Sequence, residues 1–134
     1  MSCRLLCPVR GQPLVTTNPG ISQFTEAGSG DSPGLIAIYP HAGHLVLGGT
    51  AEPGRRDREP SAQTAEAILA RCIALEPRLR TAEIIEHRAG LRPMRHEVRL
   101  EEQKGTSCAR LIRNHGHGGP GVSLAWAAPA RSPP

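Results

Sequence analysis

The amino-acid sequence predicts an α+β fold, because short strand-like segments, two of which form a hairpin, accompany a single clear amphipathic helix. A chain of 134 residues fits one ordinary domain and is long enough to bury a core. That core should be modest, since 15 glycines and 13 prolines accompany only three aromatic residues, Phe24, Tyr39 and Trp126. We therefore expect a loop-rich protein.

The N-terminal part of the chain carries one weak strand signal. Residues 9–17 are typical of a short strand, but Pro13 lacks an amide donor and confines the segment to a sheet edge or to an irregular start. From Asn18 to Gly34, glycine, proline and asparagine are so frequent that only a loop is predicted.

A hairpin and a helix follow. Residues 35–39 and 44–49 are two apolar runs separated by a four-residue turn, Pro40 to Gly43. A helix is predicted over about 60–76, with Pro60 at its first position and Pro77 ending it. Its apolar positions recur at helical spacing: Ala65, Ile68, Leu69, Cys72 and Ile73.

The second half of the chain predicts three more strands, at residues 82–88, 95–100 and 109–114. A loop that contains Gly90 and Pro93 is expected between the first two, and a polar loop over 101–108 is expected between the last two. Residues 122–128 are typical of the opening of a helix.

Charge and cysteine content exclude several classes of function. The formal charge is +4, but basic and acidic residues are interleaved, as in Arg55 to Glu59, so nucleic-acid binding is not indicated. The four cysteines form no Cys-x-x-Cys pair, which favours reduced thiols and a cytoplasmic location. No apolar run approaches the ~20 residues of a membrane span.

Gly116 to Gly121 satisfies the pattern G-x-G-x-x-G between a predicted strand and a predicted helix. A dinucleotide fingerprint also needs an acid about twenty residues later, but the thirteen residues after Gly121 include none. Two interpretations remain open. The backbone amides of the loop could approach an anionic or flat ligand, or the glycines could only allow the chain to turn sharply.

Several single residues could indicate a carboxylate-binding site, a zinc site or a hydrolase triad. Arg92 has paired donors that match a carboxylate, and Pro93 restricts its backbone, yet an arginine by itself is usually a surface residue. His115 and His117 are two residues apart in a glycine loop, which does not favour zinc. Ser123 lies in no Gly-x-Ser-x-Gly turn, so a hydrolase triad is not indicated.

Six short blocks occur in the order and spacing of D-amino-acid oxidases: residues 10–12, 18–20, 47–50, 75–79, 90–95 and 114–119. From Pro8 to Trp126 the chain resembles the C-terminal half of these FAD-dependent enzymes, and the Arg-rich segments at residues 53–57 and 76–80 look actinobacterial. The resemblance implies a mixed, largely antiparallel substrate-domain sheet with one amphipathic helix, plus fringe strands of an FAD-binding α/β domain.

The resemblance also implies three regions. Residues 1–8 would be a leader without a match, and residues 9–109 the substrate-binding portion. Residues 110–134 would form the flavin-contacting strand, the glycine-rich loop and a truncated C-terminal helix.

By resemblance, Arg92 binds the α-carboxylate of a D-amino acid, and the family passes the α-hydrogen to the flavin as a hydride, so no catalytic side chain is required. The products are a 2-oxo acid, ammonia and hydrogen peroxide. No metal, nucleic acid or membrane is implied. The residues expected to approach FAD are Gly118, Gly119, Gly121, Val122 and Ser123.

Three departures from the family pattern stand out. Ala37 occupies the position of an active-site tyrosine, and Tyr39, on the same strand face, is a poor replacement as a substrate-binding residue. Pro120 replaces an aromatic and removes a backbone donor. The family's N-terminal dinucleotide-binding segment has no counterpart, so we expect an incomplete oxidase. The alternatives are an inactive remnant, a half-enzyme that needs a separate FAD-binding partner, or a small amino-acid-binding module that uses Arg92.

Overall fold

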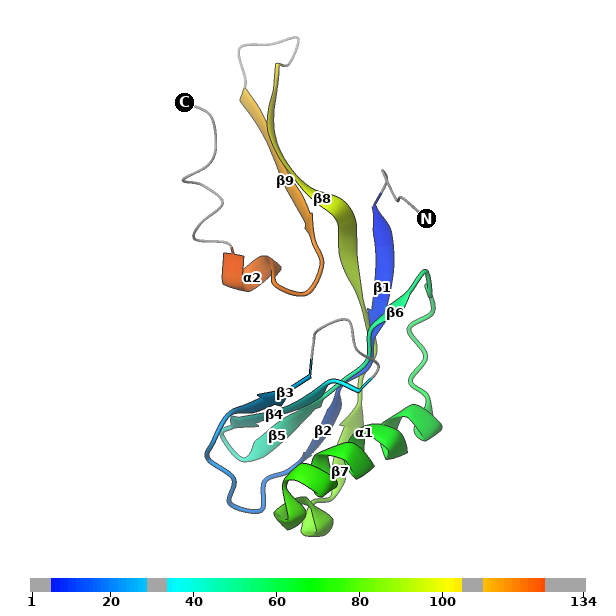
Figure 1. Cartoon of the computed structure of the whole chain (residues 1–134), viewed down its shortest axis with the longest axis vertical. Helices are drawn as coiled ribbons and strands as arrows, with labels where there is room; N and C mark the ends of the chain where they lie inside the picture. The colour runs from blue at the N-terminus through cyan, green and yellow to red at the C-terminus, as the bar shows by residue number, and fades with distance from the viewer. Residues whose placement is uncertain (1–5, 29–33, 105–109, 125–134) are drawn as a thin grey trace. The chain divides into compact units, whose positions relative to one another are not determined.

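The computed structural model describes residues 6–28, 34–104 and 110–124. The chain divides into two compact units. Unit 1 combines Met1–Val9 with Arg92–Pro134, and unit 2 is the continuous segment Arg10–Leu91. Figure 1 labels the strands and helices of both units, and each unit is described by itself below.

Unit 2 is built on a five-stranded sheet in the order β3-β4-β5-β2-β7 (Figure 1). Every neighbouring pair of strands is antiparallel. The strands are β2 (Leu14–Thr17), β3 (Thr25–Ala27), β4 (Ile36–His41), β5 (His44–Gly48) and β7 (Ile84–His87).

The predicted hairpin is confirmed as β4 and β5. His41 pairs with His44, so the turn contains only Ala42 and Gly43 rather than the four residues predicted. Gly43 has a φ of +82°, a conformation that glycine adopts without the steric cost that a side chain brings.

Helix α1 (Ala62–Leu75) covers one face of this sheet (Figure 1). Its buried residues are Ala65, Ile68 and Cys72, which share the spacing expected of one helix face. Full burial of a side chain such as Ile68 contributes about 1.5–3 kcal/mol. The core around the helix is completed by Leu14, Ile21, Ile38, Leu45, Leu47 and Leu79.

Side chains at both ends of α1 explain its bounds. Ser61 is the N-cap, and its hydroxyl accepts a hydrogen bond from the Thr64 amide at 3.3 Å. The prediction that Pro60 is the first helical residue is therefore wrong, because Pro60 precedes the cap. Pro77 ends the helix as predicted, and a 3-10 turn, η1 (Pro77–Thr81), begins there.

A second sheet has the strand order β6-β1-β8-β9. Its strands are β1 (Cys7–Gly11), β6 (Glu52–Pro53), β8 (Gly90–Lys104) and β9 (Arg110–His117). The boundary between the two units falls inside β1 and inside β8. In unit 1, β8 and β9 pair as an antiparallel ribbon, and a single-turn helix, α2 (Gly121–Leu124), follows β9.

Three loop predictions are wrong in whole or in part because distant strands supply hydrogen bonds that local sequence does not reveal. The predicted loop over residues 18–34 contains β3, which pairs with β4. The predicted loop around Gly90 and Pro93 is instead the first part of β8, which also continues through residues 101–104. The part of the predicted polar loop at 105–108 lies outside the described residues, as do residues 125–128 of the predicted C-terminal helix.

The predicted strand over residues 9–17 is interrupted at Gln12 and Pro13, which separate β1 from β2. Pro13 thus marks an irregular start, one of the two outcomes expected. It does not place β2 at an edge, since β2 pairs with both β5 and β7.

The cysteines differ from one another. Cys7 is disulfide-bonded, which contradicts the expectation of four reduced thiols. Cys72 is a free thiol on the buried face of α1, and burial raises its pKa to about 11.

The predicted fold class is confirmed, since the chain is rich in antiparallel sheet and has one main helix. Within the described ranges, no helix has the length and apolar character needed to cross a bilayer.

Candidate functional site

The glycine-rich segment after β9 lies against the start of β8 because the ribbon register shifts there. Four β8 residues face the single β9 residue Gly116, between the pairs Met94↔His117 and Arg99↔His115. Gly116 is buried and has a φ of +95°. A Cβ atom at Gly116 would lie 2.6–2.9 Å from the Cβ, Cγ and Cδ atoms of Arg95. The Arg95 side chain therefore covers Gly116 and leaves no room for a larger residue.

The next two glycines of the loop also lie against residues of β8. Gly118, with a φ of +63°, donates its amide to the Pro93 carbonyl at 2.9 Å, and a Cβ atom there would lie 3.5 Å from Cγ of Met94. A Cβ atom at Gly119 would lie 3.7 Å from Cδ of Arg92. Three side chains of the Gly90–Arg95 block thus rest on three glycines of the loop, so the two motifs that the sequence singled out form one site in unit 1.

Arg92 is half-buried on β8, and its side chain runs along the backbone of Gly119. Proline at position 93 keeps the Arg92 backbone extended, and the Gly118 bond to Pro93 fixes the loop beside it. A guanidinium on a pre-ordered backbone can bind a carboxylate through two parallel hydrogen bonds.

The remaining loop residues predicted to meet the cofactor lie at α2. A Cβ atom at Gly121 would lie 3.6 Å from Cβ of His117. Val122 is 89% exposed, and Ser123 is also exposed. The Leu124 amide donates to the Pro120 carbonyl at 2.9 Å and closes the single turn.

These features fit the ring of a flavin. Exposed Gly119 and partly exposed Gly121 carry no side chain, so a flat ring can approach their backbone closely. The amide of Gly118 already donates to the Pro93 carbonyl, so Gly118 could approach a ligand with its Cα but not with that amide. A flavin held there would supply a hydride acceptor.

Tyr39 lies in unit 2, on β4. Its ring stacks on Phe24, with centroids 4.5 Å apart and an interplanar angle of 11°. Phe24 is 65% exposed, so the pair forms an aromatic surface on the sheet. Ala37, at the position of the family tyrosine, pairs with Gly48, where a Cβ atom would lie only 3.0 Å from that of Ala37.

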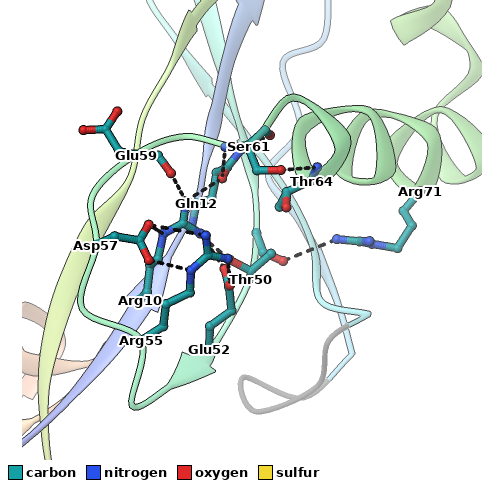
Figure 2. A network of polar contacts seen from close by, with 11 residues as sticks. Arg10, Gln12, Thr50, Glu52, Arg55, Asp57, Glu59, Ser61, Thr64 and Arg71 are labelled. Atoms are coloured by element: carbon teal, nitrogen blue, oxygen red, sulfur yellow. Dashed lines mark hydrogen bonds and ion pairs between the residues drawn. The ribbon is translucent and has the colours of Figure 1, made fainter.

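Sequence reasoning did not assign roles to Arg95 or Met94, although both stand in a motif that it quoted. No local signal marks them, because their positions against the glycines depend on the register shift between β8 and β9. It also missed a buried polar network around Arg10, shown in Figure 2.

Arg10 is fully buried, which is unusual for a charged residue. One terminal nitrogen donates to Glu52 at 2.6 Å, and the other donates to the Gln12 side chain at 2.9 Å and to the Glu59 carbonyl (Figure 2). Nε of Arg10 lies 3.3 Å from Asp57 without forming a hydrogen bond. The guanidinium is therefore held by the protein and joins three segments of unit 2.

Gln12 extends the network to the start of α1. Its amide nitrogen donates to the Ser61 carbonyl at 2.7 Å, and its oxygen accepts from the Ser61 amide at 3.0 Å (Figure 2). Burial raises the pKa of Glu52, but hydrogen bonds from Arg55, Thr50 and Arg10 outweigh burial, so the pKa lies below its ordinary value. We interpret the network as structural, because most of its polar groups form hydrogen bonds with one another.

One histidine of the loop, His117, has a polar side-chain neighbour. A ring nitrogen of His117 lies 2.6 Å from the Asn114 side-chain oxygen. Among residues 6–28, 34–104 and 110–124, no group of three or more His, Cys, Asp or Glu side chains is arranged to hold a metal ion.

The chain is similar to known flavoproteins along most of its length. The family model described as FAD dependent oxidoreductase matches residues 2–129. The D-amino-acid oxidase of Rubrobacter xylanophilus is 55% identical over 122 residues, which are 89% of this chain and 36% of that protein. The D-amino-acid oxidase of Streptomyces coelicolor is 45% identical and covers 89% of this chain and 37% of its own length.

Among solved structures, glycine oxidase from Geobacillus kaustophilus superimposes with a TM-score of 0.74 at 25% identity. The match covers 95% of this chain and 36% of the glycine oxidase. The chain therefore spans a little more than a third of the length of the proteins that it matches.

Proposed function

This chain belongs to the family of FAD dependent oxidoreductases, and we propose on that basis that it supplies the carboxylate-binding and flavin-facing residues of a D-amino-acid oxidase. The observation that carries the proposal is the position of Arg92 beside the glycine loop, where its Cδ would lie 3.7 Å from a Cβ atom at Gly119. A substrate carboxylate bound to Arg92 would lie beside the backbone that meets the flavin ring.

The proposed reaction is oxidative deamination. The α-carbon of the D-amino acid loses a hydride, and the resulting imino acid hydrolyses to a 2-oxo acid and ammonia. Bound flavin supplies the acceptor for the hydride, and molecular oxygen reoxidises it with release of hydrogen peroxide. The protein binds and orients the substrate, so none of its side chains is required as a base.

Arg92 would bind the two carboxylate oxygens. The flavin would be approached by Gly118, Gly119, Gly121, Val122 and Ser123. Residues 9–109 would then be the substrate-binding portion, and residues 110–134 the flavin-contacting portion. We further propose that the adenosine diphosphate part of FAD is held by a separate FAD-binding half, since the chain spans 36% of its relative from Rubrobacter xylanophilus.

The first test is the visible absorption spectrum of the chain purified from cells supplied with riboflavin. The proposal expects little flavin on this chain alone and about one flavin per chain when the FAD-binding half is present. D-alanine should then yield peroxide. A flavin-loaded complex that releases no peroxide with any D-amino acid would refute the assigned reaction and leave an inactive remnant as the better description.

The second test changes Arg92 to Ala in the loaded complex. The loss of two charged hydrogen bonds, at about 1.5–3 kcal/mol each, should lower kcat/KM by about 10²- to 10⁴-fold. Arg80→Ala is a matched control, since Arg80 is an exposed arginine of η1 in unit 2. Normal turnover in Arg92→Ala would exclude Arg92 as the carboxylate ligand, whereas D-alanine binding without flavin would favour an amino-acid-binding module.

A further inference from the structure

We propose that the exposed apolar side chains of unit 1 form the docking surface for the FAD-binding α/β part of an oxidoreductase of this family. The surface is defined by Met94, Val98, Leu111, Ile112, Val122 and Leu124. This inference rests on the proposed function and goes beyond it, because it assigns the side chains that hold the two parts together.

The two units differ sharply in how they bury apolar side chains. Of the twelve buried apolar residues described, only Val9 belongs to unit 1, whereas unit 2 has a closed core beneath α1. Of the eleven large apolar residues described as exposed, seven belong to unit 1, namely the six of the docking surface and Leu6. No residue of α2 is buried. The described part of unit 1 therefore lacks the core that a stable unit needs.

The strand register explains why neither face of the ribbon is closed. Leu100 pairs with Asn114 and Glu102 with Ile112, which sets Leu100 and Ile112 diagonally on one face. Leu111 lies one residue from Ile112 on β9 and so points to the opposite face. Apolar side chains are thus exposed on both faces, and a two-stranded ribbon of this kind is marginal in water.

Two observations identify the occupant. The family members that this chain matches are nearly three times its matched length, so their remaining part is large enough to cover such a surface. The surface also includes Val122 and Leu124 of α2, which follows the glycine loop directly. A partner that brings a flavin to the loop would therefore lie next to these side chains.

The test uses the full 134-residue chain. The chain is co-expressed with the part of the Rubrobacter xylanophilus D-amino-acid oxidase that it does not match, and the mass of the product is measured by light scattering after gel filtration. We expect a one-to-one complex. Ile112→Lys should weaken association by about tenfold or more, because it removes a buried apolar contact and places a charge in the interface.

Ile85→Lys is the matched control, since Ile85 is a 56% exposed isoleucine on β7 of unit 2. It should leave association unchanged. Circular dichroism checks that both variants fold. In the unaltered chain, amide hydrogen exchange of β8 and β9 should slow when the partner is added, a readout that does not depend on a variant.

The outcomes separate this inference from the proposed function. Equal association of Ile112→Lys and Ile85→Lys, no change in exchange of β8 and β9, or a homodimer that covers the surface would each overturn the docking surface. A complex that depends on Ile112 but produces no peroxide would keep the docking surface and reject the proposed reaction. Peroxide production by the chain alone would keep the reaction and reject the need for this partner.

Discussion

The substitution Gly116→Ala tests how tightly the side chains of β8 pack against the glycine loop. An alanine Cβ at this position would lie 2.6 Å from Cδ, 2.7 Å from Cγ and 2.9 Å from Cβ of Arg95. It would also require a φ of +95°, which a residue with a side chain adopts only at a cost. Both effects act on the same residue, so the loop should open locally.

Gly118 provides the control that separates the two effects. Gly118 also has a positive φ, +63°, but its Cβ would meet Met94 at 3.5 Å, an ordinary contact. Gly118→Ala should therefore cost only the backbone term, about 1–2 kcal/mol. Gly116→Ala should cost a similar or larger backbone term plus about 1–3 kcal/mol of overpacking. The expected total is about 2–5 kcal/mol.

Hydrogen exchange of the chain in complex with the FAD-binding part is the suitable assay, because unit 1 alone is marginal and the method reports the local opening free energy of unit 1 separately from unit 2. The amide of Gly118, which donates to Pro93, should exchange faster in Gly116→Ala than in the parent. Arg95→Ala in the Gly116→Ala background removes the contacts to Cγ and Cδ and should restore part of the protection. An opening free energy in Gly116→Ala no lower than in Gly118→Ala would refute the reasoning.

Two further predictions concern unit 2. Gln12→Ala leaves the Ser61 amide and carbonyl without their buried partner, and urea unfolding should show a loss of about 2–4 kcal/mol, whereas exposed Gln23→Ala should change stability by less than about 0.5 kcal/mol. Burial raises the pKa of Cys72 to about 11 from 9.0, so the folded state resists ionisation. The stability due to the neutral thiol is complete below pH 9 and is lost as the pH rises towards 11, so urea unfolding should show a decline over this range. The variant Cys72→Ala should lack this decline, and an equal decline in the variant would contradict the assignment to Cys72.

The sequence predicted those elements whose signals are local. The hairpin has a turn at Gly43 between two apolar runs, and α1 has apolar spacing together with a proline that ends it. Strand β3 was not predicted, because its three residues lie in a polar segment and form a strand only by pairing with β4. The same reason applies to Gly90 and Pro93, which look like a loop but belong to β8.

The candidate site was predictable in its parts and not in its arrangement. Arg92 and the glycines were quoted from the sequence, but their contact depends on a register shift in which four β8 residues face Gly116. The buried network was hidden for a related reason. Arg10 and Gln12 bond to residues 42 and 49 positions later, and nothing near Arg10 in the sequence marks it as a buried charge.

The order of the units along the chain bears on how such proteins diversify. Unit 2 is one uninterrupted segment, whereas unit 1 is assembled from the residues before and after it. A recombination event with two crossover points, one in β1 and one in β8, could exchange the whole helix-covered sheet as a cassette. Arg92 and Gly119 lie outside that cassette, so a lineage could exchange unit 2 and keep the proposed carboxylate-binding arginine and its glycine neighbour unchanged.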